Sequence, residues 1–295
     1  MPTRRLIIGC GYLGQRVADR WLQSEDAVFA LTRSPAHAEQ FRRQGIVPII
    51  GDVVDSASLQ SLPEVDTVLW AVGWDRASAR SMDEVYVGGL ENVCRVMRTR
   101  SKRFISISST SVYGQNQGEW VDEESICQPL LANGKTCLAA EQVLANSAIT
   151  EVCGSRLETT VLRLSGIYGP GRLLSRTATL KNGDALNGNP DAWLNLIHVD
   201  DAADMVVKCA AAHQSPRLLL VSDDEPVRRR DYYSALAARV GAPPPRFVVE
   251  EREALPTELE LNKRCRNSLS KSNLGWSPRF PTYREGLLHS IDLNG

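Results

Sequence analysis

The sequence predicts an α/β fold built on a doubly wound parallel sheet, with helices on both faces and a smaller, interleaved C-terminal lobe. Short apolar runs of strand length alternate with amphipathic segments of helical period. A glycine-rich turn directly follows the first run. The chain has 295 residues, enough for one large α/β domain or two smaller lobes.

Six apolar runs in the first 165 residues are predicted strands: Leu6–Ile8, Val28–Leu31, Val47–Ile50, Val68–Val72, Phe104–Ile107 and Val161–Leu164. Four segments between them are predicted helices: Gln15–Leu22, Ala36–Gln44, Val85–Met97 and Thr136–Ala145. In the first helix Val17, Ala18 and Trp21 fall on one face, as packing against a sheet requires. The strands are continuously apolar, which is typical of a parallel sheet covered on both faces.

The pattern becomes less regular after about residue 165. Gly and Pro gather at 166–171 and 183–190, and helices are predicted near 200–212 and 231–240 with a strand at Leu218–Val221 between them. We therefore expect a first domain over residues 1–165. A mixed lobe over 166–295 is expected to interleave with the last strands of the sheet.

Composition excludes several classes of function. The net charge of −1 gives no bulk attraction to nucleic acid, and no apolar run approaches the ~20 residues that span a bilayer. Seven cysteines, an odd number without a C-x-x-C pair, and four scattered histidines predict reduced thiols and no metal site. The N-terminus has no secretory apolar region. These features predict a cytoplasmic protein without nucleic-acid or membrane partners.

The first predicted strand leads into Gly9-Cys10-Gly11-Tyr12-Leu13-Gly14, a G-x-G-x-x-G motif followed by a helix. This strand–turn–helix context is the one in which the motif binds dinucleotides in Rossmann-type domains. Gly9 permits the tight turn, Gly11 lets the backbone approach a pyrophosphate, and Gly14 allows close helix–strand packing. We expect residues 9, 11, 12, 13 and 14 to contact an NAD(P) cofactor. A glycine-rich turn without a ligand is the alternative.

The end of the second predicted strand bears on the choice of dinucleotide. NAD-preferring sites place an acid there for the ribose 2′-hydroxyl, but this segment reads Thr32-Arg33-Ser34. Because an arginine can pair with a 2′-phosphate, NADP is favoured and NAD is the alternative. Arg33 could instead be a solvated surface charge. Asp52, after the third strand, is predicted to contact the adenine side, although ordinary capping would also account for it.

Four further motifs occur in a recognisable order. They are Ser108-Ser109-Thr110-Ser111-Val112-Tyr113-Gly114, Leu162-Arg163-Leu164-Ser165-Gly166-Ile167-Tyr168-Gly169-Pro170-Gly171, Ile197-His198-Val199-Asp200-Asp201 and Asn273-Leu274-Gly275-Trp276-Ser277-Pro278. With them the chain resembles, nearly end to end, the extended short-chain dehydrogenases/reductases of the NAD-dependent epimerase/dehydratase family, in particular the atypical, YeeZ-like branch. The resemblance implies a small-molecule substrate, Pro170 near the nicotinamide, and a homodimer formed through the two helices predicted at 85–97 and 136–145.

The resemblance also implies a catalytic Tyr-x-x-x-Lys pair, and here the sequence departs from the family. Alignment on the Leu-Ala-Ala-Glu that ends at position 141 puts Asn133 at the tyrosine and Cys137 at the lysine. Asparagine is no acid or base near neutral pH, and cysteine supplies no fixed positive charge. Lys135 would be the substitute only if the helix start shifted, because it lies about 200° around a regular helix from Cys137.

Ser109 matches the catalytic Ser/Thr of the family, four residues before Tyr113. It is predicted to orient a substrate, or alternatively to satisfy backbone groups at a strand end. Two hypotheses on function remain open. In the first, the chain is an NAD(P)-dependent oxidoreductase or epimerase that acts, with altered proton transfer, on a small polar molecule, nucleotide-linked molecules included. Alternatively, it is a catalytically silent NAD(P)-binding redox sensor or scaffold.

Overall fold

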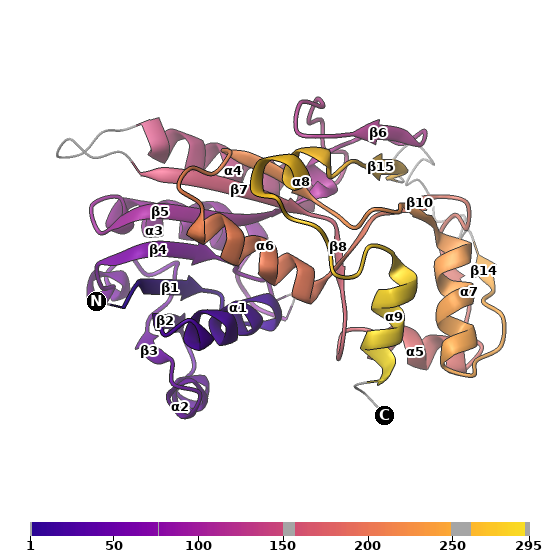
Figure 1. The fold of residues 1–295 in the computed structure, drawn as a ribbon, viewed down its shortest axis with the longest axis horizontal. Coiled ribbons are helices and arrows are strands. Elements are labelled where there is room, and N and C mark those ends of the chain that lie inside the picture. Colours follow the sequence, from indigo (N-terminus) through magenta and orange to yellow (C-terminus); the bar gives the residue numbers. More distant parts are fainter. Residues whose placement is uncertain (1, 76, 150–156, 249–260, 293–295) are drawn as a thin grey trace.

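The computed structural model describes residues 2–75, 77–149, 157–248 and 261–292. Seven parallel strands form one sheet in the order β12-β7-β5-β4-β1-β2-β3, which confirms the predicted doubly wound sheet (Figure 1). The strands are β1 (Arg4–Ile8), β2 (Ala27–Thr32), β3 (Val47–Ile50), β4 (Val65–Trp70), β5 (Ser101–Ser109), β7 (Glu158–Leu164) and β12 (Leu218–Val221).

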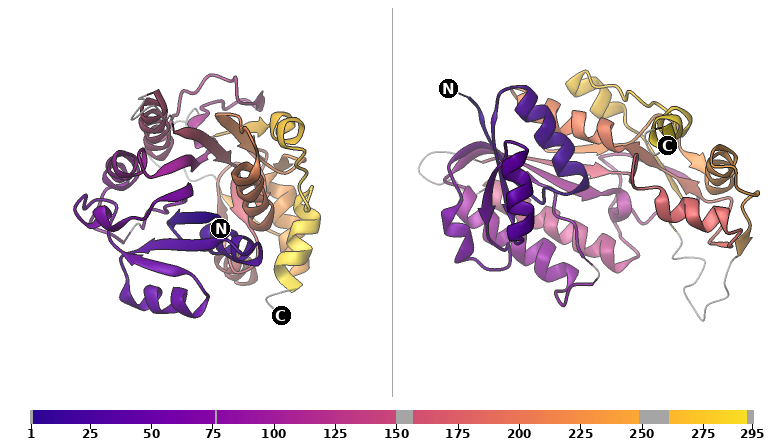
Figure 2. Two further views of the ribbon diagram at one scale, coloured as in Figure 1. Left: turned by 60° about the vertical axis from the view of Figure 1, so that its left-hand side comes forward. Right: turned by 90° about the horizontal axis from the view of Figure 1, so that it is seen from below.

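Helices cover both faces of this sheet (Figure 2). One face carries α1 (Tyr12–Gln23), α2 (Pro35–Arg43) and α6 (Val199–Ala211), and the other carries α3 (Gly89–Met97) and α4 (Ala132–Ile149). In β1, Ile7 joins the apolar cluster of α1 and α6, whereas Leu6 and Ile8 join the cluster of α3 and α4. Because successive side chains enter opposite cores, every position must be apolar. This is why the strands read as continuous runs.

Three short helical segments precede or interrupt these elements. They are the 3-10 turns η1 (Ser58–Ser61) and η3 (Thr110–Val112), and the π-helical turn η2 (Glu84–Gly88) that runs into α3. The helix predicted to start at Val85 therefore starts as a π turn. Helix α4 begins four residues before the predicted start at Thr136.

The second half of the chain builds a smaller lobe beside the carboxyl ends of the strands (Figure 1). Its helices are α5 (Leu174–Lys181), α7 (Arg229–Arg239) and α9 (Tyr283–Asp292), whereas α8 (Ser268–Leu274) packs against the edge strand β12, where the Ser270 hydroxyl donates to the Leu220 carbonyl. Four two-stranded pairs accompany them: β8 (Gly166–Tyr168) with β11 (Leu196–His198), β9 (Leu186–Asn187) with β14 (Phe247–Val248), β10 (Trp193–Leu194) with β13 (Val227–Arg228), and β6 (Glu119–Val121) with β15 (Lys263–Cys265).

The two halves of the sequence interleave in space. Strand β12 and helix α6 come from the second half but complete the large sheet and its covering layer, and β6 comes from the first half but pairs with β15 in the smaller lobe. A domain boundary near residue 165 stays a prediction. None of the described helices is long and apolar enough to cross a membrane. Six cysteines are free thiols, and Cys153 lies outside the described residues.

The order of the strands determines where a ligand fits. From β1 the chain proceeds to β2 and β3 on one side, then returns to β4 and β5 on the other. Such a reversal leaves a crevice at the carboxyl ends of the two central strands, because the loops that leave them turn in opposite directions. The crevice here lies above β1 and β4.

Candidate functional site

The glycine-rich turn between β1 and α1 forms the floor of this crevice. Gly9 has a φ of +93°, and a Cβ there would lie 2.4 Å from the carbonyl oxygen of Ala71. A Cβ on Gly14 would lie 2.7 Å from the carbonyl oxygen of Gly9, so that glycine brings α1 close to β1. A Cβ on Gly11 would meet no atom within 4 Å. Gly11 is therefore the position at which the backbone faces open space.

The amino end of α1 points its amide groups at the same space. The helix begins after Gly11, has no side-chain N-cap, and carries no acidic residue in its first turn. Its first amides are consequently available to a ligand, and the helix dipole favours a negative charge there. The turn and helix end thus fit a pyrophosphate.

A cleft of about 810 Å³ extends from this point along the carboxyl ends of the strands. This size lies within the range of cofactor pockets. Of the predicted cofactor residues, the lining includes Gly9, Gly11, Tyr12, Leu13, Arg33 and Asp52. Gly14 supports the floor from behind, and Pro170 reaches the site through its carbonyl group, which accepts a hydrogen bond from the Tyr12 hydroxyl at 3.0 Å.

Exposed cations border the cleft. Arg33 and Arg172 both line it, and neither has a carboxylate within ion-pair distance among the described residues. The Arg172 guanidinium lies 5.1 Å from the centre of the Tyr12 ring. Asp52 accepts a hydrogen bond from the amide of Val54, so its carboxylate caps a turn as well as facing the cleft. Two unpaired arginines beside an open helix end favour an anionic ligand.

The positions of the absent catalytic pair lie on the first turns of α4, outside the lining of this cleft. Asn133 and Lys135 are exposed, whereas Cys137 is buried. Burial raises the pKa of the Cys137 thiol, so it is neutral at physiological pH. Lys135 therefore does not share the buried face of Cys137, as its spacing predicts.

Ser109 ends β5, and its hydroxyl oxygen accepts a hydrogen bond from the amide of Ser111 at 3.1 Å. It caps the 3-10 turn that follows and does not line the cleft. This contact corresponds to the structural alternative considered for Ser109, and it leaves the hydroxyl proton available to another acceptor. A substrate-orienting role for Ser109 stays a prediction.

Sequence reasoning missed several residues that line the cleft, including the following four. His37 follows the N-cap of α2, Trp74 and Arg80 lie in the loop after β4, and Tyr86 lies in η2. Tyr86 accepts a hydrogen bond from the Trp74 amide at 3.2 Å. No motif marks these positions, because they are assembled from loops. The only available signal was Ala71-Val72, which extends the apolar run of β4 beyond the strand and into the cleft wall.

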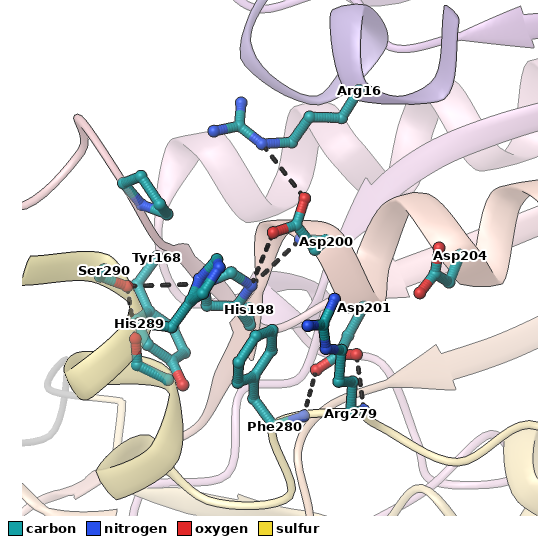
Figure 3. A network of polar contacts seen from close by, with 12 residues as sticks. Arg16, Tyr168, His198, Asp200, Asp201, Asp204, Arg279, Phe280, His289 and Ser290 are labelled. Carbon is teal, nitrogen blue, oxygen red and sulfur yellow. Dashed lines mark hydrogen bonds and ion pairs between the residues drawn. The ribbon is translucent and has the colours of Figure 1, made fainter. Parts of the chain in front are cut away.

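A second polar cluster joins β11 and α6 to α9, outside the lining of the cleft (Figure 3). His198 is fully buried, and its Nδ1 atom accepts a hydrogen bond from the Asp200 amide at 3.2 Å. Its Nε2 atom lies 3.4 Å from Nδ1 of His289. Because Nδ1 of His198 is an acceptor, neutral His198 carries its proton on Nε2, which faces Nδ1 of His289 and, at 3.5 Å, the hydroxyl oxygen of Ser290.

Potential metal-ligating atoms of His198, Asp200 and His289 lie within 4.8 Å of one another. The Asp200 carboxylate, however, already pairs with Arg16 and Arg20. Two guanidinium groups oppose a further cation at this position. We therefore interpret the cluster as a structural junction between the lobes.

Acid should weaken this junction. Burial lowers the pKa of His198 to about 4, with Asp200 opposing this shift and His289, Arg16 and Arg279 adding to it. Between pH 6.5 and 4 the unfolded chain takes up a proton that the folded protein excludes, so stability present above pH 6.5 is lost as the pH falls. The loss amounts to up to ~3 kcal/mol. Urea denaturation of wild type and His198→Asn should show their stability difference shrinking over this range.

The comparison with a variant is needed because a neighbouring carboxyl acts in the opposite direction. Burial raises the pKa of Asp201 to about 6, which adds stability as the pH falls through that value towards the ordinary aspartate pKa of 3.8. This contribution is shared by wild type and variant and cancels in the difference. Parallel pH profiles for the two proteins would contradict the assignment to His198.

Comparison with known proteins places the chain in a family context. The sequence model described as "NAD dependent epimerase/dehydratase family" matches residues 6–221. Protein YeeZ of Escherichia coli K12 is 27% identical over 248 residues, covering 82% of this chain and 85% of that protein. Short-chain dehydrogenase/reductase family 42E member 1 of Danio rerio is 25% identical over 259 residues, covering 79% of this chain and 66% of that protein, just under two thirds.

The fold is also shared with a solved structure that contains ligands. MoeE5, in complex with UDP-glucose and NAD, superposes with a TM-score of 0.80 at 21% identity, covering 99% of this chain and 98% of that chain. At this level of identity the match shows the α/β fold. This shared fold agrees with the order of the strands in the sheet and with the position of the smaller lobe beside their carboxyl ends.

Proposed function

The chain belongs to the NAD-dependent epimerase/dehydratase family, and from that premise we propose that it binds NADP, in preference to NAD, in the cleft above β1. The observation that carries the proposal is Gly11, which faces open space beside the uncapped amino end of α1. That arrangement provides backbone donors for a pyrophosphate without a side chain in the way. The bound dinucleotide would supply hydride transfer.

Preference for NADP rests on Arg33. It lies directly after β2, at the position where a carboxylate would bind a ribose 2′-hydroxyl, and no carboxylate neutralises it among the described residues. The adjacent Ser34 caps α2, and its hydroxyl accepts from the His37 amide at 3.3 Å. A 2′-phosphate would therefore meet one guanidinium and the amino end of a helix together.

Removing the Arg33 side chain should change selectivity. Loss of a charge-assisted contact is expected to weaken NADP binding about 10- to 100-fold in Arg33→Ala while NAD binding changes less than about twofold. Calorimetric titration with NADPH, NADP, NADH and NAD measures this. Arg42→Ala is the matched control, because Arg42 pairs with Glu39 on the exposed side of α2, the helix that follows Arg33, and does not line the cleft. Equal losses for both dinucleotides would contradict the assignment.

We further propose that the chain acts as an oxidoreductase or epimerase on a small polar substrate, with the lobe over residues 166–295 as the substrate side. The nucleotide-sugar ligand of MoeE5 supports a nucleotide-linked substrate. Ser109, whose proton is available, would orient a substrate oxygen. A homodimer through α3 and α4, and residence in the cytoplasm, remain parts of this proposal.

The second candidate is a redox sensor or scaffold without turnover. It is favoured by the exposed Asn133 and the buried neutral thiol of Cys137, since neither supplies the proton transfer of the missing pair. Two assays separate the two candidates: oxidation of NADPH by carbonyl compounds detects a reductase, and chromatographic analysis of nucleotide sugars incubated with the protein and NADP detects an epimerase, which returns its hydride and oxidises no net cofactor. Turnover above the rate without protein excludes the sensor, and binding without turnover across the panel favours it.

A further inference from the structure

The hydroxyl of Tyr86 is a free hydrogen-bond donor in the wall of the cleft. Two tyrosines line the cleft, Tyr12 and Tyr86. Tyr12 donates to the carbonyl oxygen of Pro170. Tyr86 accepts from the Trp74 amide, but its own proton has no acceptor within the part of the chain that the structure describes. A half-buried phenol usually donates its proton in a hydrogen bond. We therefore expect a ligand in the cleft to accept a hydrogen bond from the Tyr86 hydroxyl.

Tyr86 stands next to the position where the family's lysine is missing. A short hydrogen bond connects the start of α4 to the π turn η2: the Thr136 hydroxyl donates to the carboxylate of Asp83, the N-cap residue of η2. Tyr86 packs against the buried apolar cluster that contains Cys137, and burial raises the pKa of its hydroxyl. A π turn shifts side chains relative to an ordinary helix and is frequent at functional sites.

The position of Tyr86 along the cleft selects the part of the dinucleotide that it meets. Arg33 and His37 lie at the β2 end, Gly11 lies at the centre above β1, and Tyr86 lies on the β4 side. With the pyrophosphate at Gly11 and the adenosine half towards Arg33, the other half must extend over β4. Adjacent strands lie about 4.8 Å apart. The part of the dinucleotide that lies one strand spacing from the pyrophosphate, above β4, is the sugar attached to the pyrophosphate on that side.

We propose that the Tyr86 hydroxyl donates a hydrogen bond to a hydroxyl of the nicotinamide-bearing ribose and thereby positions that half of the dinucleotide. Tyr86 is a positioning residue in this role, and a raised pKa suits it because the phenol stays protonated and keeps its donor. The inference rests on the proposed dinucleotide function.

The test uses three ligands that differ in length. Calorimetry compares wild type and Tyr86→Phe with the intact dinucleotide, with ADP-ribose, which ends at the second ribose, and with the adenosine half alone. All three ligands are used in the same form, either with or without the 2′-phosphate. The form chosen is that of the dinucleotide that the wild type binds more tightly. Tyr86→Phe should weaken the intact dinucleotide and the ADP-ribose compound about five- to tenfold, and leave the adenosine half unchanged. Tyr233→Phe, in the smaller lobe and outside the cleft, should change none of them.

Each other result has a defined meaning. Unchanged affinity for the two longer ligands overturns the inference. A loss confined to the intact dinucleotide also overturns it, because the contact would then be with the nicotinamide ring. An equal loss for all three ligands shows general damage to the cleft and excludes a specific contact. If wild type binds none of the three, the proposed function itself fails, which is distinguishable from failure of the role of Tyr86.

Discussion

Gly11→Ala is expected to lower the affinity for the dinucleotide by about 30- to 100-fold, or ~2–3 kcal/mol, while the folded protein remains stable. The added methyl group meets no protein atom within 4 Å, so it projects into the space that the pyrophosphate would occupy. It would hold the phosphate oxygens away from the first amides of α1 and prevent close approach of the backbone. Calorimetric titration with the dinucleotide, together with thermal denaturation, measures both quantities.

Gly9→Ala is the matched control, two residues away in the same turn. Its φ of +93° disfavours a side chain, and the new Cβ would lie 2.4 Å from the Ala71 carbonyl oxygen and 2.5 Å from the Val72 amide nitrogen. Because these are backbone atoms of the neighbouring strand end, they cannot rotate away. We expect a loss of at least ~2 kcal/mol in the free energy of unfolding. Equal destabilisation by the two alanines would show that Gly11 serves the turn and not a ligand.

The contrast between these two glycines indicates which structural features can be predicted from sequence patterns. The spacing G-x-G-x-x-G after an apolar run was sufficient to predict the strand, the turn, the helix and the roles of Gly9 and Gly14, because local backbone geometry fixes all of them. The continuous strands were equally readable, since burial on both faces removes any alternative to apolar residues. Sheet order then placed the crevice without further information.

The far wall of the cleft was not predictable in this way. Trp74, Arg80 and Tyr86 reach it from a loop and a π turn whose shapes depend on packing against α4. The sequence marked Cys137 as the position of the missing lysine and as a small buried residue, but the packing of Tyr86 against its cluster depends on how η2 lies on α4. Short pairs such as β6 with β15 join segments more than 100 residues apart and leave no periodic signal. Tertiary contacts between distant segments determine these features.

Glu141→Gln is expected to destabilise the protein by about 3–5 kcal/mol, because it leaves a charged guanidinium buried without its partner. Arg163, on β7, is buried and makes a bidentate contact with Glu141 on α4, with Nη2 to Oε2 at 2.6 Å and Nε to Oε1 at 3.0 Å. Its Nη1 atom also donates to the Tyr113 hydroxyl at 2.9 Å, and the Ser108 hydroxyl donates to Glu141 at 2.6 Å. Urea denaturation measures the loss.

A surface pair in the same sheet provides the control. Arg103 contacts Glu158 at 2.8 Å, but the Glu158 side chain is 57% exposed, so Glu158→Gln should cost less than about 1 kcal/mol. Similar losses in the free energy of unfolding for Glu141→Gln and Glu158→Gln would show that burial does not increase the contribution of the Arg163–Glu141 pair to stability.

The reciprocal variant, Arg163→Met, should lose less stability than Glu141→Gln, and the difference has a chemical cause. An unpaired carboxylate can take up a proton and become neutral, whereas a guanidinium stays charged at any accessible pH. Arg163→Met should therefore recover stability relative to wild type as the pH is lowered towards 5, and Glu141→Gln should not. The double variant Glu141→Met/Arg163→Met removes both charges and should be more stable than Glu141→Gln. Because this pair fastens α4 to β7, its loss should also loosen the contact of η2 with α4, and with it the wall of the cleft that contains Tyr86.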